Sequence, residues 1–189
     1  MKRSAGGRLP NAMSDYGASR SRRLLMRGTC RKMDLRSKNL IDDVQQALRV
    51  CCPGEICYDI EKIPNLPGSY ALILALWQDC DIEVGRLGHL HFKSGFYGYA
   101  GSAKGAGGLS SRLARHYRHE KAFRWHIDYL RAYADVIGVW LTLKGSECEI
   151  ADALKGLPTA YPAVPGFGAS DCRTCDTHLL RLAGMTLVD

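Results

Sequence analysis

The sequence lacks a long hydrophobic run. Of its 189 residues, 46% are apolar, yet the longest uncharged apolar stretch is the eight residues from Tyr70 to Trp77. A helix needs about 20 such residues to cross a bilayer, so we expect no membrane contact. The N-terminus also lacks the apolar segment of a secretory signal. We therefore expect a cytoplasmic protein, with organelle targeting by the N-terminal segment as the minority alternative.

Without a secretory signal, the eight cysteines are expected in a reducing compartment, as free thiols or metal ligands before disulfides. The most specific group is Cys172-x-x-Cys175-x-x-His178, whose spacing permits three ligands to one Zn²⁺. A fourth ligand is not apparent nearby, and Cys148 or His126 would have to approach through the fold. A lone CxxC is a weak zinc signal, so we expect thiols here rather than zinc.

Acidic residues are scarce at the N-terminus. Residues 1–38 hold eleven Lys or Arg and two acids, a net charge of +9, whereas the remaining 151 residues carry −2. The segment has little apolar periodicity, which predicts a disordered basic leader. Three explanations stay open: a true start at Met13, Met26 or Met33, a basic arm that contacts nucleic-acid phosphates, or a transit peptide.

The rest of the chain shows no internal repeat and divides into three parts. A short amphipathic helix over 40–50 and a proline-containing linker make up residues 39–65. A main domain is expected over 66–182, and a tail over 183–189. Within the main domain the patterns predict strands at 70–77, 82–84, 89–92, 96–100, 136–143 and an edge strand at 178–182, and helices at 109–119, 123–134 and 147–155. This order predicts a small α/β fold with a mixed sheet flanked by helices.

One stretch carries residues suited to phosphodiester chemistry. A strand ends near Tyr99, a glycine-rich loop follows over 101–108, and the next helix places Arg112 and His116 four residues apart. Arginine offers a fixed fork to phosphate oxygens, and tyrosine or histidine can orient or deprotonate water. Glu147, at the start of a later helix, could hold a divalent cation through its oxygens.

Several strings, taken in order, resemble the GIY-YIG nuclease superfamily. Gly68-Ser-Tyr70 is similar to its first motif, Tyr99-Ala-Gly101 to its second, and Leu109-x-x-Arg112-x-x-x-His116 to its arginine helix. Further strings resemble the Uri-type branch: Gly85-Arg-Leu-Gly88, Gly95-Phe-Tyr-Gly-Tyr-Ala-Gly-Ser102, Trp125-His-Ile-Asp-Tyr-Leu130 and Val164-Pro-Gly-Phe-Gly168 with Ser170-Asp-Cys172. The resemblance covers about residues 66–182. Ser69 and Ala100 depart from the motifs at packing positions, and an extra hairpin at 79–92 lengthens the gap between the two tyrosines.

The resemblance implies hydrolysis of DNA phosphodiester bonds with one Mg²⁺ or Mn²⁺. Tyr70 would position or deprotonate the attacking water, and Tyr99 would share its hydrogen-bond network. Arg112 would stabilise the charge of the phosphorane. His116 is a further candidate catalytic residue that would face the phosphate; the alternative is that it is a surface histidine without a catalytic role.

The metal ligand implied by the resemblance is a helix glutamate. Glu147 fits the pattern of apolar residues three and four positions later, and Glu149 is the alternative. Lys104 and Arg115 are candidate phosphate ligands. No nucleotide cofactor is expected, and the oligomeric state is open.

Two other functions remain open. The first is a catalytically silent nucleic-acid-binding module of the same fold, which the near-neutral main domain favours. The second is a small zinc-bound interaction protein that uses the C-terminal cysteines. DNA cleavage would favour the nuclease over both, whereas stoichiometric zinc would favour the second.

Overall fold

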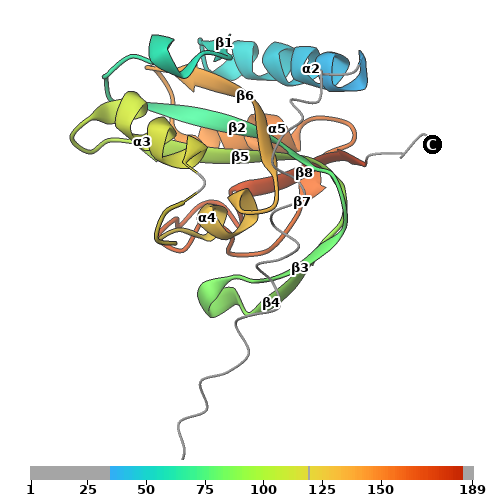
Figure 1. The fold of residues 1–189 in the computed structure, drawn as a ribbon. Helices are drawn as coiled ribbons and strands as arrows, with labels where there is room; N and C mark the ends of the chain where they lie inside the picture. Colours follow the sequence, from blue (N-terminus) through green and yellow to red (C-terminus); the bar gives the residue numbers. More distant parts are fainter. Residues whose placement is uncertain (1–34, 119, 185–189) are drawn as a thin grey trace, which may run out of the picture. The chain divides into compact units, whose positions relative to one another are not determined.

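The computed structural model describes residues 35–118 and 120–184. They form an α/β fold in which helices flank a β-sheet (Figure 1), as the sequence predicts. Most of the expected leader (1–34), His119 and the last five residues of the expected tail (185–189) lie outside the described residues. None of the described helices is long and apolar enough to cross a membrane.

The described residues contain a six-stranded sheet with the strand order β1-β6-β2-β5-β8-β7. Its strands are β1 (Glu55–Cys57), β2 (Gly68–Leu76), β5 (Gly95–Ala103), β6 (Asp135–Thr142), β7 (Tyr161–Pro162) and β8 (Leu179–Gly184). Each neighbouring pair is antiparallel, so the expectation of a mixed sheet is wrong. Strand direction depends on the paths of the connections, for which local patterns carry no signal.

Strand β2 lies between β6 and β5 and is buried on both faces. Its side chains alternate between the two faces. Leu72 and Leu74 enter one hydrophobic cluster, whereas Ala71 and Ile73 enter the other. Covered on both sides, the strand has no polar face, which explains its continuous apolar run.

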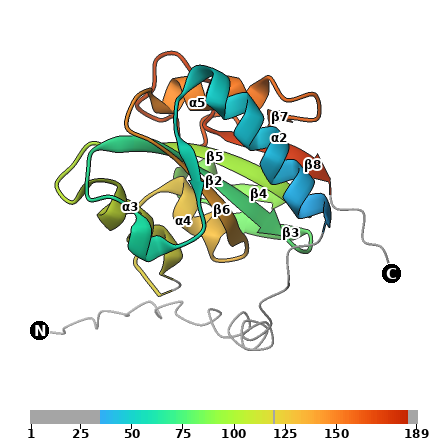
Figure 2. The ribbon, with the colours of Figure 1, turned by 90° about the horizontal axis from the view of Figure 1, so that it is seen from above.

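Helices and a hairpin cover the two faces. The cluster with Ile73 also contains side chains of α2 (Leu35–Cys51) and α5 (Glu147–Lys155), and Figure 2 shows both helices over the sheet. The cluster with Leu72 contains side chains of α3 (Gly108–Tyr117) and α4 (His126–Arg131). The elements on this second face include the hairpin of β3 (Cys80–Glu83), the 3-10 turn η3 (Gly85–Leu87) and β4 (His89–Phe92); another 3-10 turn, η2 (Ile60–Lys62), precedes β2.

Some predicted boundaries are wrong. Helix α2 begins at Leu35 and buries Ser37, so the basic leader ends before residue 38. Strand β1 forms inside the expected linker because it pairs with β6. Strand β8 is not at the edge, since the two residues of β7 pair with it.

Helix α4 is shorter than predicted. The carboxylate of Asp128 accepts hydrogen bonds from the backbone N–H groups of Arg124 and Trp125. These bonds cap α4 at Trp125, whose backbone is extended, and Phe123, which lies before the helix, is exposed. A local cap therefore overrides the apolar spacing that predicts a helix from Phe123.

Candidate functional site

The two motif tyrosines lie on one face of the sheet, on neighbouring strands. Tyr70 of β2 is paired with Gly101 of β5, and Leu72 with Tyr99. Tyr70 and Tyr99 are thus diagonal neighbours, close enough for long side chains to interact. Both belong to the cluster packed against α3 and α4 and are buried, with exposed fractions of 2% and 7%.

Two glycines make room for these rings. A Cβ atom at Gly101 would lie 2.5 Å from the hydroxyl oxygen of Tyr70, and one at Gly168 would lie 2.6 Å from Cε2 of Tyr99. Gly168 also has a φ of +75°, a backbone conformation that residues with a side chain rarely adopt. The tyrosine positions therefore depend on the absence of a side chain at both glycines.

The hydroxyl of Tyr70 lies 2.7 Å from Nε2 of His116 in α3. Burial raises the pKa of Tyr70 well above its usual value, and the charges of Arg112 and Glu147 act on it in opposite directions. Burial, aided by the positive charge of Lys121, lowers the pKa of His116 to about 3. At neutral pH a protonated hydroxyl therefore meets a neutral imidazole. The alternative of a surface histidine at His116 is wrong, since its exposed fraction is 1%.

Arg112 lies beside this pair and has a partly free guanidinium group. Its Nε donates a hydrogen bond of 3.0 Å to the carbonyl of Ser102, at the end of β5. Its Cζ lies 3.9 Å from the centre of the Trp125 ring, a cation–π geometry. Among residues 35–118 and 120–184, the two terminal nitrogens make no hydrogen bond, so the fork can still bind an anion.

Sequence reasoning missed the role of Asp128, which is fully buried. Its carboxylate lies 2.5 Å from Nη2 of Arg115 and 3.1 Å from Nζ of Lys121. Arg115 also donates to the carbonyl of Ala122. Arg115, predicted as a phosphate ligand, thus holds the segment between α3 and α4 in place. Only its position in the Trp125–Leu130 string could have drawn attention to Asp128.

Glu147 and Glu149 differ clearly, although both lie in the first turn of α5. Glu149 is exposed, and its carboxylate accepts from the N–H and hydroxyl of Ser146 in a capping box, which lowers its pKa. Glu147 is half-buried, and its Oε2 is buried without a hydrogen bond in the described structure. The Nζ of Lys104 lies 3.7 Å from that oxygen. Of the two glutamates, Glu147 is thus the one with a buried carboxylate oxygen that accepts no hydrogen bond from the described residues, and Lys104, a predicted phosphate ligand, forms an ion pair with it.

A second group of side chains gathers near the start of α5. Ligand atoms of Cys148, Cys172, Cys175 and His178 lie within 4.8 Å of one another. The hydroxyl of Thr174 lies 3.3 Å from the sulfurs of both Cys148 and Cys172. Its hydrogen bond to Cys172 is the main cause that lowers the pKa of that thiol.

The fold thus supplies the fourth ligand that the sequence did not show locally. Cys148 approaches from α5, whereas His126 uses its Nδ1 to accept the N–H of Gly168. Three thiols and one imidazole form a set that can hold a metal, and this set suits zinc rather than magnesium. The expectation of thiols without a metal site therefore needs revision.

Comparison with known proteins adds one finding. No curated protein and no solved structure matches the chain. A family model described as "Domain of unknown function DUF123" matches residues 69–188. This match spans 120 of the 189 residues and includes both motif tyrosines, the arginine helix and the thiol–imidazole group. The chain therefore belongs to the DUF123 family.

Proposed function

We propose that this chain is a metal-dependent endonuclease of the GIY-YIG type that hydrolyses DNA phosphodiester bonds. The observation that carries the proposal is the 2.7 Å contact between the Tyr70 hydroxyl and His116 Nε2, within the electrostatic reach of Arg112 and Glu147. These residues come from three distant segments and match the motifs of the resemblance one by one.

The protonation states favour a positioning role for Tyr70. With its pKa raised well above the usual value, its hydroxyl stays protonated at neutral pH. Its partner His116, with a pKa of about 3, is a weak acceptor for a proton. The pair therefore orients the attacking water rather than removing its proton, and His116 fixes the direction of the hydroxyl.

The two charged residues have separate roles. The terminal nitrogens of Arg112 would bind the phosphate and stabilise the charge that develops on it. Glu147 would hold Mg²⁺ or Mn²⁺, because its Oε2 is buried without a hydrogen bond. A bound divalent ion would neutralise charge on the leaving oxygen. The proposed substrate is DNA, selected by its structure, and the proposed compartment is the cytoplasm.

The test is a cleavage assay of the full chain with Mg²⁺ or Mn²⁺ on labelled single-stranded, duplex, flap and four-way-junction DNA. We expect Arg112→Ala and Glu147→Gln to lower the rate by about 10²–10³, the typical effect of losing one group that stabilises the transition state. Glu149→Gln is the matched control: it removes a carboxylate from the same turn and should keep cleavage. Equal rates for wild type and Arg112→Ala would contradict the assignment.

One observation favours a catalytically silent DNA-binding module as the second candidate. The Nζ of Lys104 lies 3.7 Å from the Glu147 carboxylate. Its positive charge already neutralises part of the negative charge that would attract a divalent ion. This candidate predicts DNA binding without cleavage under every metal condition. Metal-dependent cleavage that Glu147→Gln abolishes would exclude it.

A further inference from the structure

The group formed by Cys148, Cys172, Cys175 and His178 has the dimensions of a tetrahedral metal site. The four ligand atoms lie within 4.8 Å of one another, and the sulfurs of Cys148 and Cys172 are 3.5 Å apart. Zinc–sulfur bonds of about 2.3 Å at tetrahedral angles place two sulfurs about 3.8 Å apart. Small movements of the side chains would therefore bring all four atoms into coordination.

The imidazole of His178 has an unsatisfied nitrogen. The residue is 4% exposed, and its Nε2 is buried without a hydrogen-bond partner in the described residues. A buried polar atom in this state costs free energy unless a partner is supplied. A metal ion among the three neighbouring thiols would be such a partner.

The loop that carries three of the four ligands is long and has no regular secondary structure. Residues 163–178, between β7 and β8, contain no helix or strand, and loops of this length are uncommon in a compact domain. The N–H of Cys175 points at the sulfur of Cys172, 3.3 Å away. Such a turn brings both thiols of the CxxC to the same side, as a shared metal requires.

We propose that Cys148, Cys172, Cys175 and His178 bind one structural Zn²⁺. Thiolate and imidazole ligands favour zinc over the hard ions magnesium and calcium. Four protein ligands close the tetrahedron and leave no position for water or substrate, which is the mark of a structural site. This ion is distinct from the Mg²⁺ or Mn²⁺ assigned to Glu147.

The zinc would join elements that are distant in sequence. Cys148 lies in the first turn of α5, whereas His178 directly precedes β8. The carbonyl of His178 accepts the N–H of Ala100 in β5, next to Tyr99. The ion would therefore fasten α5 and the loop over 163–178 to the strand that carries Tyr99. Because Cys148 follows Glu147, it would also fix the backbone beside that carboxylate.

The experiment measures metal in the untagged full chain, purified without chelator and dialysed against metal-free buffer. Elemental analysis should find about one zinc per chain. Cys172→Ser should reduce the zinc to background. Cys57→Ser is the matched control, because Cys57 is a half-buried thiol that donates to the backbone carbonyl of Asp59, and it should keep the zinc.

A second measurement covers the case in which Cys172→Ser fails to fold. The wild-type chain, stripped of metal and titrated with Co²⁺, should develop the thiolate charge-transfer bands and intense visible bands of a tetrahedral site. Zinc should then displace the cobalt and raise the Tm of the stripped chain.

Several outcomes would overturn the proposal. They are a chain without zinc that shows no cobalt bands, zinc that Cys172→Ser retains, an iron–sulfur chromophore, or a disulfide between Cys172 and Cys175 in protein kept under reducing conditions. None of these readouts depends on DNA cleavage, so failure of the zinc site and failure of the nuclease proposal are distinguishable.

Discussion

At the scale of single residues, the site is organised by contacts that a linear motif does not display. The two tripeptide motifs and the arginine helix predicted Tyr70, Tyr99, Arg112 and His116, but the bond between Tyr70 and His116 follows from packing α3 against the sheet. The ion pair of Arg115 with Asp128 depends likewise on the fold, because it joins α3 to α4. Residue types can be predicted from sequence, whereas their partners depend on tertiary packing.

The first prediction concerns Gly101. A Cβ there would lie 2.5 Å from the Tyr70 hydroxyl, so Gly101→Ala must displace the ring and weaken its bond to His116. We expect a loss of about 1–3 kcal/mol in unfolding free energy, the range for overpacked cores, measured by urea denaturation. Gly105→Ala is the control, since Gly105 has nothing within 4 Å of its Cβ position. Equal losses in both variants would contradict this reading.

At the scale of elements, the sequence patterns located most strands and the helix α5. The helix predicted at 147–155 is confirmed as α5, which begins after Ser146 in a capping box with Glu149. The short strand β1 was missed because its three residues carry no pattern of their own and pair with β6 only in the fold. The antiparallel direction was also missed, because it depends on how the strands are connected.

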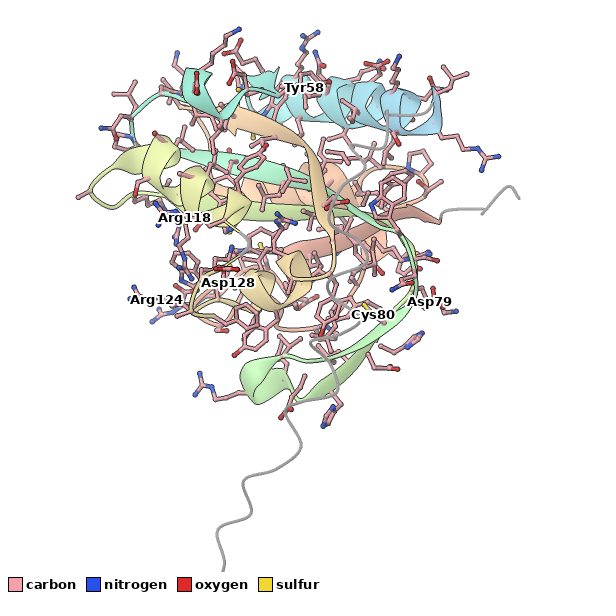
Figure 3. The ribbon with its side chains drawn as sticks, viewed as in Figure 1. Tyr58, Asp79, Cys80, Arg118, Arg124 and Asp128 are labelled. Carbon is pink, nitrogen blue, oxygen red and sulfur yellow. The ribbon has the colours of Figure 1, made fainter. Side chains whose placement is uncertain are left out.

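The second prediction concerns the segment that joins α3 and α4. Arg118 and Arg124 are exposed on the side of Asp128 (Figure 3), whereas Arg115 and Lys121 are held by that carboxylate. We expect the double variant Arg118→Ala/Arg124→Ala to reduce the log–log salt slope of DNA binding by roughly 1.8, about 0.9 for each phosphate contact.

The matched control is the double variant Arg49→Ala/Lys155→Ala. It also removes two exposed positive charges, but from α2 and α5, which cover the opposite face of the sheet from α3 and α4. Fluorescence anisotropy with labelled DNA at several salt concentrations gives both slopes. A control slope that falls as much as the test slope would mean that binding responds to net charge alone.

At the scale of the whole molecule, the third prediction concerns stability against acid. The pKa of His116 is about 3 in the folded state and about 6.5 in an unfolded chain. The unfolded state therefore binds one more proton between these values, so stability falls as the pH drops below 6.5. Between pH 7 and pH 5 this amounts to about 2 kcal/mol.

The variant His116→Gln isolates this contribution, because glutamine can bond to Tyr70 but does not titrate. Urea denaturation at pH 7, 6 and 5 should show that the variant loses about 2 kcal/mol less than the wild type. Parallel losses in the two proteins would mean that the pKa of His116 is the same in the folded and unfolded states.

The close approach of Gly101 and Tyr70 also has an evolutionary consequence. A side chain at position 101 would occupy the space of the tyrosine ring at position 70. A relative with a side chain at position 101 is therefore expected to carry a residue smaller than tyrosine at position 70. The residue pair aligned with 70 and 101 would then report, without any structure, which relatives keep the tyrosine hydroxyl beside the histidine. Relatives with a side chain at the position of Gly101 are the ones in which we expect the proposed nuclease activity to be absent.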